Sequence, residues 1–225
     1  MSKVLILVEG QSEETFVREI LAPHLFANGV YLQATLMTTR RVKRGPDFKG
    51  GVVSYEKFKR EIRRLLGDTS AAIVTTMIDF YGLPTSFVER KTMSGGSCYD
   101  QVAHLEDAIR QDISHPKFVP YLALHEFEAM LFVAPEKIAQ AFPHTDKSKE
   151  LTAIKKQFKS PEEIDDNPQT APSKRLMTLF PDYQKPLHGP LVILEIGIER
   201  IREECSHFDG WLAKLEKLGK SQGAQ

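Results

Sequence analysis

One stretch near the N-terminus constrains the fold more than any other. Residues 3–8 are almost all Leu, Ile or Val, and such a run without a turn former is typical of a strand buried on both faces. The run ends on Glu9 and Gly10. Ser12 can then cap a helix. The two glutamates that follow it would lie in the first turn, where the positive end of the helix dipole favours them. The sequence therefore predicts a central parallel strand with Glu9 at its carboxyl end, where open α/β sheets bind ligands.

The same alternation of apolar run and amphipathic helix continues along the first part of the chain. Further strands are predicted in three segments: 30–37, 71–78 and 118–124. Helices between them predict a parallel four-stranded sheet with right-handed crossovers, flanked by helices. From Pro135 the pattern changes to short helices broken by prolines. We therefore expect an α/β core over 1–134, a helical extension over 135–219 packed on it, and a disordered tail over 220–225.

The overall charge does not by itself indicate a nucleic-acid-binding protein. Lys and Arg total 30, Asp and Glu total 30, and the formal net charge is zero. Any attraction to phosphate must therefore come from local patches. No apolar run approaches the roughly 20 residues that span a bilayer, and the N-terminus lacks a signal-peptide pattern. Cys98 and Cys205 lack metal-site spacing. We expect a cytoplasmic protein with reduced thiols and no membrane partner.

Acidic residues stand at the ends of three predicted strands: Glu9, Asp79, and Glu126 with Glu128. Because parallel strands end at one edge of a sheet, we expect these carboxylates to gather there, where they repel one another unless a cation neutralises them. Oxygen donors without a His–Cys set favour Mg²⁺ or Mn²⁺ over Zn²⁺. Such an ion can polarise a phosphoryl oxygen and activate water. The alternative is that each acid caps the helix after its strand, the commoner role for a single acid.

Basic residues near the same edge suit phosphate binding. Four follow the second strand: Arg40, Arg41, Lys43 and Arg44. Arginine contacts phosphate in a bidentate way, but a solvated basic loop is an equal alternative. Lys174 and Arg175 begin a predicted helix after Pro172, where backbone amides would assist phosphate binding. An internal salt bridge to Asp165 or Asp166 is the alternative there.

Three further residues lie beside the strand-end acids. His125 precedes the pair Glu126 and Glu128. A lone histidine in such a place is more often a core hydrogen-bonding group, but beside two glutamates it can hold a charge near neutral pH and act as a base. Gly10 and Gly82 are expected to permit tight turns close to the acids.

Four motifs together resemble a known family over nearly the whole chain. They are VEGQSEE at 8–14, DFYGLP at 79–84, HEFEAMLF at 125–132 and PSKR at 172–175. In these motifs the chain is similar to an uncharacterised bacterial Toprim-like family of unknown function. More distantly it resembles the Toprim fold of topoisomerases, primases and overcoming-lysogenization-defect nucleases. The resemblance implies a Toprim-like α/β core followed by a helical C-terminal extension.

The resemblance also implies roles for individual residues. Glu9 matches the Toprim glutamate, which is a metal ligand or general acid/base, and Asp79 matches the first Asp of an Asp-x-Asp pair. The second Asp is replaced by Tyr81, and a phenol is a poor ligand for Mg²⁺. Glu126 or Glu128 would have to supply the missing carboxylate.

These observations lead to one favoured function and two rivals. We expect a Mg²⁺- or Mn²⁺-dependent nuclease acting on DNA or RNA, with Glu9, Asp79 and Glu128 as metal ligands and with Glu126 and His125 also in the catalytic set. The resemblance alone implies a bacterial defence or mobile-element setting and a partner ATPase of the ABC or AAA type. The first rival is a catalytically inactive nucleic-acid-binding or ATPase-regulating subunit, which Tyr81 favours. The second rival is an enzyme that transfers phosphate on a nucleotide or phosphorylated small molecule.

Overall fold

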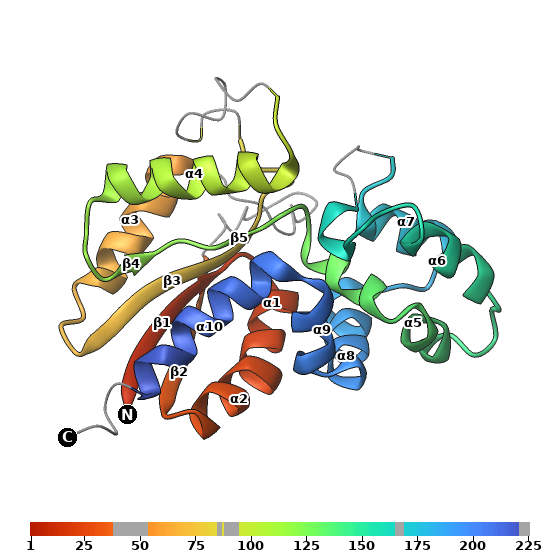
Figure 1. Cartoon of the computed structure of the whole chain (residues 1–225), viewed down its shortest axis with the longest axis horizontal. Coiled ribbons are helices and arrows are strands. Elements are labelled where there is room, and N and C mark those ends of the chain that lie inside the picture. Colours follow the sequence, from red (N-terminus) through yellow and green to blue (C-terminus); the bar gives the residue numbers. More distant parts are fainter. Residues whose placement is uncertain (38–53, 85–86, 88–94, 165–168, 221–225) are drawn as a thin grey trace, which may run out of the picture.

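The computed structural model describes residues 1–37, 54–84, 87, 95–164 and 169–220 (Figure 1). Its centre is a parallel sheet in the order β2-β1-β3-β4, with β5 also paired to β3. The strands are β1 (Ser2–Val8), β2 (Val30–Leu36), β3 (Ala71–Asp79), β4 (Phe118–Val119) and β5 (Leu122–Ala123). The predicted α/β class with a parallel sheet flanked by helices is therefore confirmed.

The predicted fourth strand is divided into β4 and β5. Pro120 lies between them and has no backbone N–H to donate to the sheet. At the next residue, the Thr76 hydroxyl takes the place of a ladder partner. It accepts a hydrogen bond from Tyr121 N (2.9 Å) and donates one to Tyr121 O (2.7 Å). A side chain of β3 thus satisfies the backbone where the strand is interrupted.

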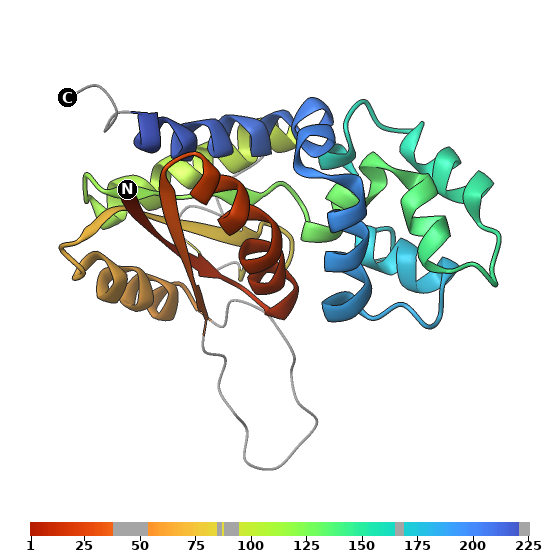
Figure 2. The same ribbon diagram turned by 90° about the horizontal axis from the view of Figure 1, so that it is seen from below.

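Helices cover both faces of the sheet and extend beyond one end of it. They are α1 (Gln11–Phe16), α2 (Ala22–Ala27), α3 (Tyr55–Leu66), α4 (Cys98–Ile113), α5 (Pro135–Ala141), α6 (Ser148–Lys155), α7 (Pro172–Leu179), α8 (Lys185–Ile196), α9 (Ile198–Glu204) and α10 (Ser206–Lys220). A π-helix, η1 (Val17–Leu21), continues α1 into α2, and two 3₁₀-helices are η2 (Phe127–Val133) and η3 (Pro161–Glu163). Figures 1 and 2 show α3 and α4 on one face of the sheet and α1, α2 and α10 on the other.

The alternation of side chains along β1 explains why the strand is apolar from Val4 to Val8. Val4, Ile6 and Val8 pack into one hydrophobic cluster, and Leu5 and Leu7 pack into the other. Successive side chains of a strand point to opposite faces, so a strand with a helical layer on each side needs apolar residues at every position.

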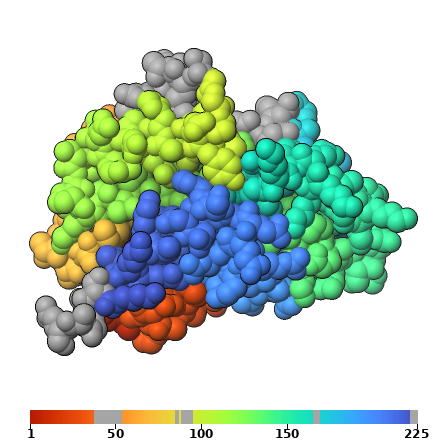
Figure 3. Space-filling model, viewed as in Figure 1, coloured from red at the N-terminus to blue at the C-terminus, as the bar shows by residue number. Residues whose placement is uncertain are grey.

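The helices after residue 134 share a core with the sheet. The hydrophobic cluster that contains Val4 of β1 also contains Leu151 of α6, Leu176 of α7 and Ile193 of α8. The chain then returns through α10, whose blue atoms lie across the visible face of the molecule (Figure 3). Lys220 is the last residue of α10 and is helical rather than part of a disordered tail, and 221–225 lie outside the described residues. The boundary at residue 134 stays a prediction.

No helix in the described part of the chain has both the length and the apolar character needed to cross a membrane.

Candidate functional site

The tips of β1 and β3 bring two of the predicted acids together. The two strands are parallel neighbours, and Val8 pairs with Met77. Glu9 therefore follows β1 at the edge where β3 ends on Asp79. The Asp79 backbone N–H donates to Glu9 Oε2 at 3.1 Å. The Asp79 side chain is buried, while Glu9 is half-buried. The carboxylate of Glu9 thus lies against the end of the neighbouring strand.

The chain after β5 adds two more acids to this edge. Because β5 pairs Ala123 with Asp79, the residues that follow cross beside the tip of β3. The Phe127 N–H donates to Asp79 Oδ1 at 2.9 Å. Glu126 and Glu128 flank Phe127 at the start of η2, and both are buried.

Glu13 joins the same group and was not predicted as a site residue. It lies in the first turn of α1 and is 5% exposed. A Cβ added to Gly10 would lie 3.0 Å from Glu13 Oε2, so Gly10 leaves the space that this carboxylate uses. A helix that starts directly after a strand turns its first residues back toward the strand end. That geometry, together with the spacing of four from Glu9, is the signal that could have identified Glu13.

Lys185 is the second residue that the sequence did not reveal. It is the first residue of α8, far from the acids along the chain. Its Nζ lies 2.9 Å from Glu128 Oε2, and the Tyr183 hydroxyl donates to Glu128 Oε1 at 3.4 Å. The Glu128 side chain is 0% exposed, whereas that of Lys185 is 37% exposed. The helical extension therefore supplies a cation to the sheet edge.

We call five residues the acidic cluster: Glu9, Glu13, Asp79, Glu126 and Glu128. Burial, reinforced by the charge of Glu13, raises the pKa of Glu9 to about 7. Burial also raises the pKa of Glu128 to about 7 against the opposing effect of Lys185, and it raises the pKa of Asp79 well above its usual range. Holding these groups ionised together costs free energy unless a positive charge compensates.

The charge of Lys185 responds to the same cluster. Burial alone would lower the pKa of its ammonium, but the carboxylates of Glu128, Asp79 and Glu126 outweigh that effect and raise the pKa above its ordinary value. Lys185 is therefore charged at neutral pH. One ammonium against five carboxyl groups leaves the cluster with an excess of negative charge whenever most of them are ionised.

Glu126 has a second set of contacts, outside the cluster. Its Oε2 accepts the Ser173 N–H at 2.8 Å, and its Oε1 accepts the Ser173 hydroxyl at 3.0 Å. Ser173 lies in the first turn of α7, so Glu126 caps this helix from outside. Backbone amides at the start of this helix were expected to assist phosphate binding, and one of them, that of Ser173, donates to a carboxylate instead.

Of the basic residues predicted to bind phosphate, the structure describes Lys174 and Arg175. Lys174 is exposed on α7. Arg175 is half-buried, donates from Nε to Thr170 O at 2.6 Å, and lies 5.7 Å from the centre of the Phe158 ring. The proposed salt-bridge partners of these two, at 165–166, lie outside the described residues. So do four of the predicted phosphate-binding residues: Arg40, Arg41, Lys43 and Arg44.

The remaining predicted residues lie around the tip of β3. His125 is 6% exposed, and its backbone oxygen accepts the Tyr81 N–H at 2.9 Å. Tyr81 is half-buried. Gly82 has a φ of +79°, a left-handed conformation that permits the turn after β3. The catalytic role of His125 stays a prediction.

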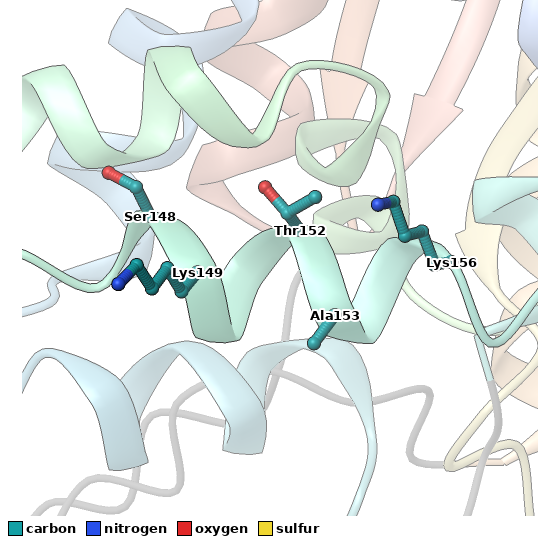
Figure 4. A pocket seen from close by; sticks show the side chains of 5 residues that line it. All are labelled: Ser148, Lys149, Thr152, Ala153 and Lys156. Atoms are coloured by element: carbon teal, nitrogen blue, oxygen red, sulfur yellow. The ribbon is translucent and has the colours of Figure 1, made fainter.

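The acidic cluster is not arranged as a set of metal ligands in this structure. Within the described ranges, no group of three or more His, Cys, Asp or Glu side chains is placed to hold an ion. Two cavities lie away from the cluster. One, of about 380 Å³, is lined by residues on and just after α6, and Figure 4 shows their side chains along this single helix. The other, of about 120 Å³, lies beside His207 and Trp211.

The smaller cavity contains a histidine–carboxylate pair. His207 Nε2 lies 3.1 Å from Glu106 Oε1, and the His207 ring stacks on Tyr121 at 5.1 Å between centroids. Burial would lower the pKa of His207, but the hydrogen bond to Glu106 and the charges of Glu106 and Glu162 raise it above its ordinary value.

This pair predicts a pH-dependent stability. The folded-state pKa of His207 is raised, so its contribution is complete below the ordinary histidine value and is lost as pH rises through the folded-state value. We expect the melting temperature of the wild type to fall by a few degrees as pH rises through the folded-state pKa of His207. We expect this fall to be absent in His207→Gln. Thermal denaturation at several pH values measures both. The control is His144→Gln, because His144 is exposed. An unchanged pH profile in His207→Gln would contradict this assignment.

The sequence matches the family model described as "Domain of unknown function (DUF4276)" over residues 8–216. No curated protein matches it. Among solved structures, the C-terminal region of the Burkholderia pseudomallei OLD protein is similar at 15% identity, with 96% of this chain and 98% of that chain covered and a TM-score of 0.45. The corresponding region of the Xanthomonas campestris pv. campestris OLD protein gives 16% identity, 94% coverage of each chain and a TM-score of 0.40. The predicted resemblance to a family of unknown function is confirmed.

Proposed function

We propose that this chain, which belongs to the DUF4276 family, is a divalent-cation-dependent phosphodiesterase that acts on DNA or RNA. The observation that supports the proposal is the acidic cluster. Five carboxyl groups from β3, from the turn after β1, from α1 and from the segment after β5 meet at the carboxyl edge of a parallel sheet. That edge is where open α/β sheets bind their ligands.

The donor atoms of the cluster suit Mg²⁺ or Mn²⁺. They are all carboxylate oxygens, which hard divalent cations prefer. The cluster also holds one positive charge already, the ammonium of Lys185. In this proposal Glu9, Asp79 and Glu128 hold the ion. When bound, such an ion would polarise a phosphoryl oxygen and lower the pKa of a water molecule.

The hydrogen bonds around the cluster would orient these ligands. Asp79 N holds Glu9, and Phe127 N holds Asp79. Glu126 acts as a positioning residue, because its bonds to Ser173 connect the start of η2 to α7. His125 is proposed to carry a proton beside the cluster. The phosphate backbone of the substrate would be bound by Lys174, Arg175 and the basic residues of 40–44.

The proposed setting rests on the sequence motifs alone. We propose a cytoplasmic protein in a bacterial defence or mobile-element system, working beside an ABC- or AAA-type ATPase. The two free cysteines suit a reducing compartment.

Three observations favour the rival function of a catalytically inactive subunit that binds nucleic acid or regulates an ATPase. Tyr81 stands where a second aspartate would ligate a metal. Lys185 already neutralises Glu128, and the described residues contain no arranged set of ligands. In that rival, the lysine permanently replaces a metal ion at the sheet edge.

The test is a cleavage assay with single-stranded DNA, double-stranded DNA and RNA, in Mg²⁺ or Mn²⁺ and in EDTA. We expect cleavage of at least one polymer with metal and none in EDTA. The absence of cleavage together with the absence of heat on titration with millimolar metal would support the inactive rival. Turnover of mononucleotides without cleavage of any polymer would support phosphate transfer on a small molecule.

A further inference from the structure

We propose that Lys185 is a built-in counter-cation that competes with the divalent cation for the acidic cluster. Its ammonium binds Glu128 while the metal is absent and moves into solvent when the metal binds. The inference rests on the proposed function, because it concerns the same cluster. It adds a property of the site: metal binding is an exchange of one cation for another.

Glu128 is the residue that makes the competition necessary. Its side chain is 0% exposed, and its Oε2 is 2.9 Å from Lys185 Nζ. Its other oxygen accepts the Tyr183 hydroxyl at 3.4 Å. A metal ion on Glu128 would share this carboxylate with the ammonium, and two cations on one buried carboxylate repel each other strongly. The metal ion and the ammonium therefore compete for the carboxylate of Glu128.

The position of Lys185 allows it to leave without unfolding its surroundings. It is the first residue of α8, and the side chain of the preceding residue, Gln184, forms no cap hydrogen bond with this helix end. The lysine side chain is 37% exposed, although the carboxylate that it contacts is fully buried. A lysine has a flexible stem and a strongly hydrated charge, so rotation of its side chain can carry the ammonium from Glu128 into water.

The contacts of the cluster suit such an exchange, because a charged group of the protein already pairs with Glu128. Protein groups contact three carboxylates of the cluster: Asp79 N donates to Glu9, Phe127 N donates to Asp79, and the Lys185 ammonium pairs with Glu128. This is the arrangement expected of a cluster whose positive charge comes from the protein itself.

The first test is titration calorimetry with Mn²⁺ on the wild type and on Lys185→Met. Removing the competing charge should raise the affinity for Mn²⁺ at least about tenfold. The matched control is Lys155→Met. Lys155 forms a 2.6 Å ion pair with Glu204, and its side chain is 28% exposed, but its partner lies outside the cluster. The affinity of the Lys155→Met variant for Mn²⁺ should equal that of the wild type. An unchanged or weaker affinity in Lys185→Met would overturn the inference.

A second test needs no substitution, because Lys185→Met leaves Glu128 buried without its cation and could unfold. The wild-type protein is acetylated with and without Mn²⁺, and the modification of each lysine is followed by mass spectrometry. We expect Mn²⁺ to accelerate acetylation of Lys185 several-fold and to leave Lys155 unchanged. Equal or slower modification of Lys185 in a protein that binds Mn²⁺ would show that the ammonium stays in place, and only this inference would fail. If no variant binds Mn²⁺ at all, the proposed function fails with it.

Discussion

Replacing Glu9 by Gln should reduce metal-dependent cleavage by at least about a hundredfold while the melting temperature stays the same or rises. The loss of activity follows from the loss of a negatively charged ligand at the carboxyl edge of β1. Two effects explain why stability is retained. A glutamine oxygen can still accept the Asp79 N–H, which lies 3.1 Å from Glu9 Oε2. The uncharged glutamine also removes the repulsion between position 9 and the carboxylates of Glu13 and Asp79.

The matched control for this prediction is Glu14→Gln. Glu14 belongs to the same helix turn as Glu13, but it forms a surface pair with Arg18 at 3.0 Å. Exposed pairs contribute little to stability, so cleavage and melting temperature should both resemble the wild type. If Glu9→Gln cleaves as fast as Glu14→Gln, then Glu9 has no part in the reaction, and the acidic cluster has a structural role instead.

Replacing Trp211 by Ala should destabilise the protein by about 3–5 kcal/mol. Trp211 is 3% exposed and stacks on Tyr121 with ring centroids 4.4 Å apart. Its Nε1 donates to Thr75 Oγ1 of β3 at 2.9 Å. The substitution would leave a cavity between α10 and the sheet and would remove the hydrogen bond of a fully buried threonine. Urea denaturation measures the change in the free energy of unfolding.

The matched variant is Trp211→Phe, which keeps most of the apolar packing and removes the indole N–H. We expect a smaller loss, of about 1–2 kcal/mol, chiefly from the unpaired Thr75 hydroxyl. A loss below about 1 kcal/mol in Trp211→Ala would mean that α10 contributes little to the fold. The hydrophobic cluster around Trp211 indicates that the helical extension and the sheet share a core. So small a loss would contradict that conclusion.

The sequence predicts the sheet because its strands carry a local signal. Residues 3–8 and 71–78 are mostly apolar or β-branched, and the structure buries both faces of β1 between helical layers. The convergence of Glu9 with Asp79 also follows from local information. Once two parallel strands are neighbours, the residues after their carboxyl ends must lie at one edge of the sheet.

Features that depend on contacts between distant residues were not predictable in this way. The break between β4 and β5 depends on the Thr76 hydroxyl, which bonds the backbone of Tyr121. Lys185 lies in a helix whose amphipathic pattern gives no indication that its first residue reaches the sheet edge. Glu13 lies between these two cases. It and Glu14 are neighbours in sequence, and only their positions around the helix axis decide which of the two carboxylates is buried.

The central claim is that the acidic cluster binds a divalent cation at the carboxyl edge of β1 and β3. Diffraction from crystals soaked in Mn²⁺, recorded near the manganese absorption edge, tests it most directly. The account predicts an anomalous peak among the carboxylates of Glu9, Asp79 and Glu128, with the Lys185 ammonium turned into solvent. No peak at millimolar Mn²⁺, with Lys185 still bound to Glu128, would contradict the claim.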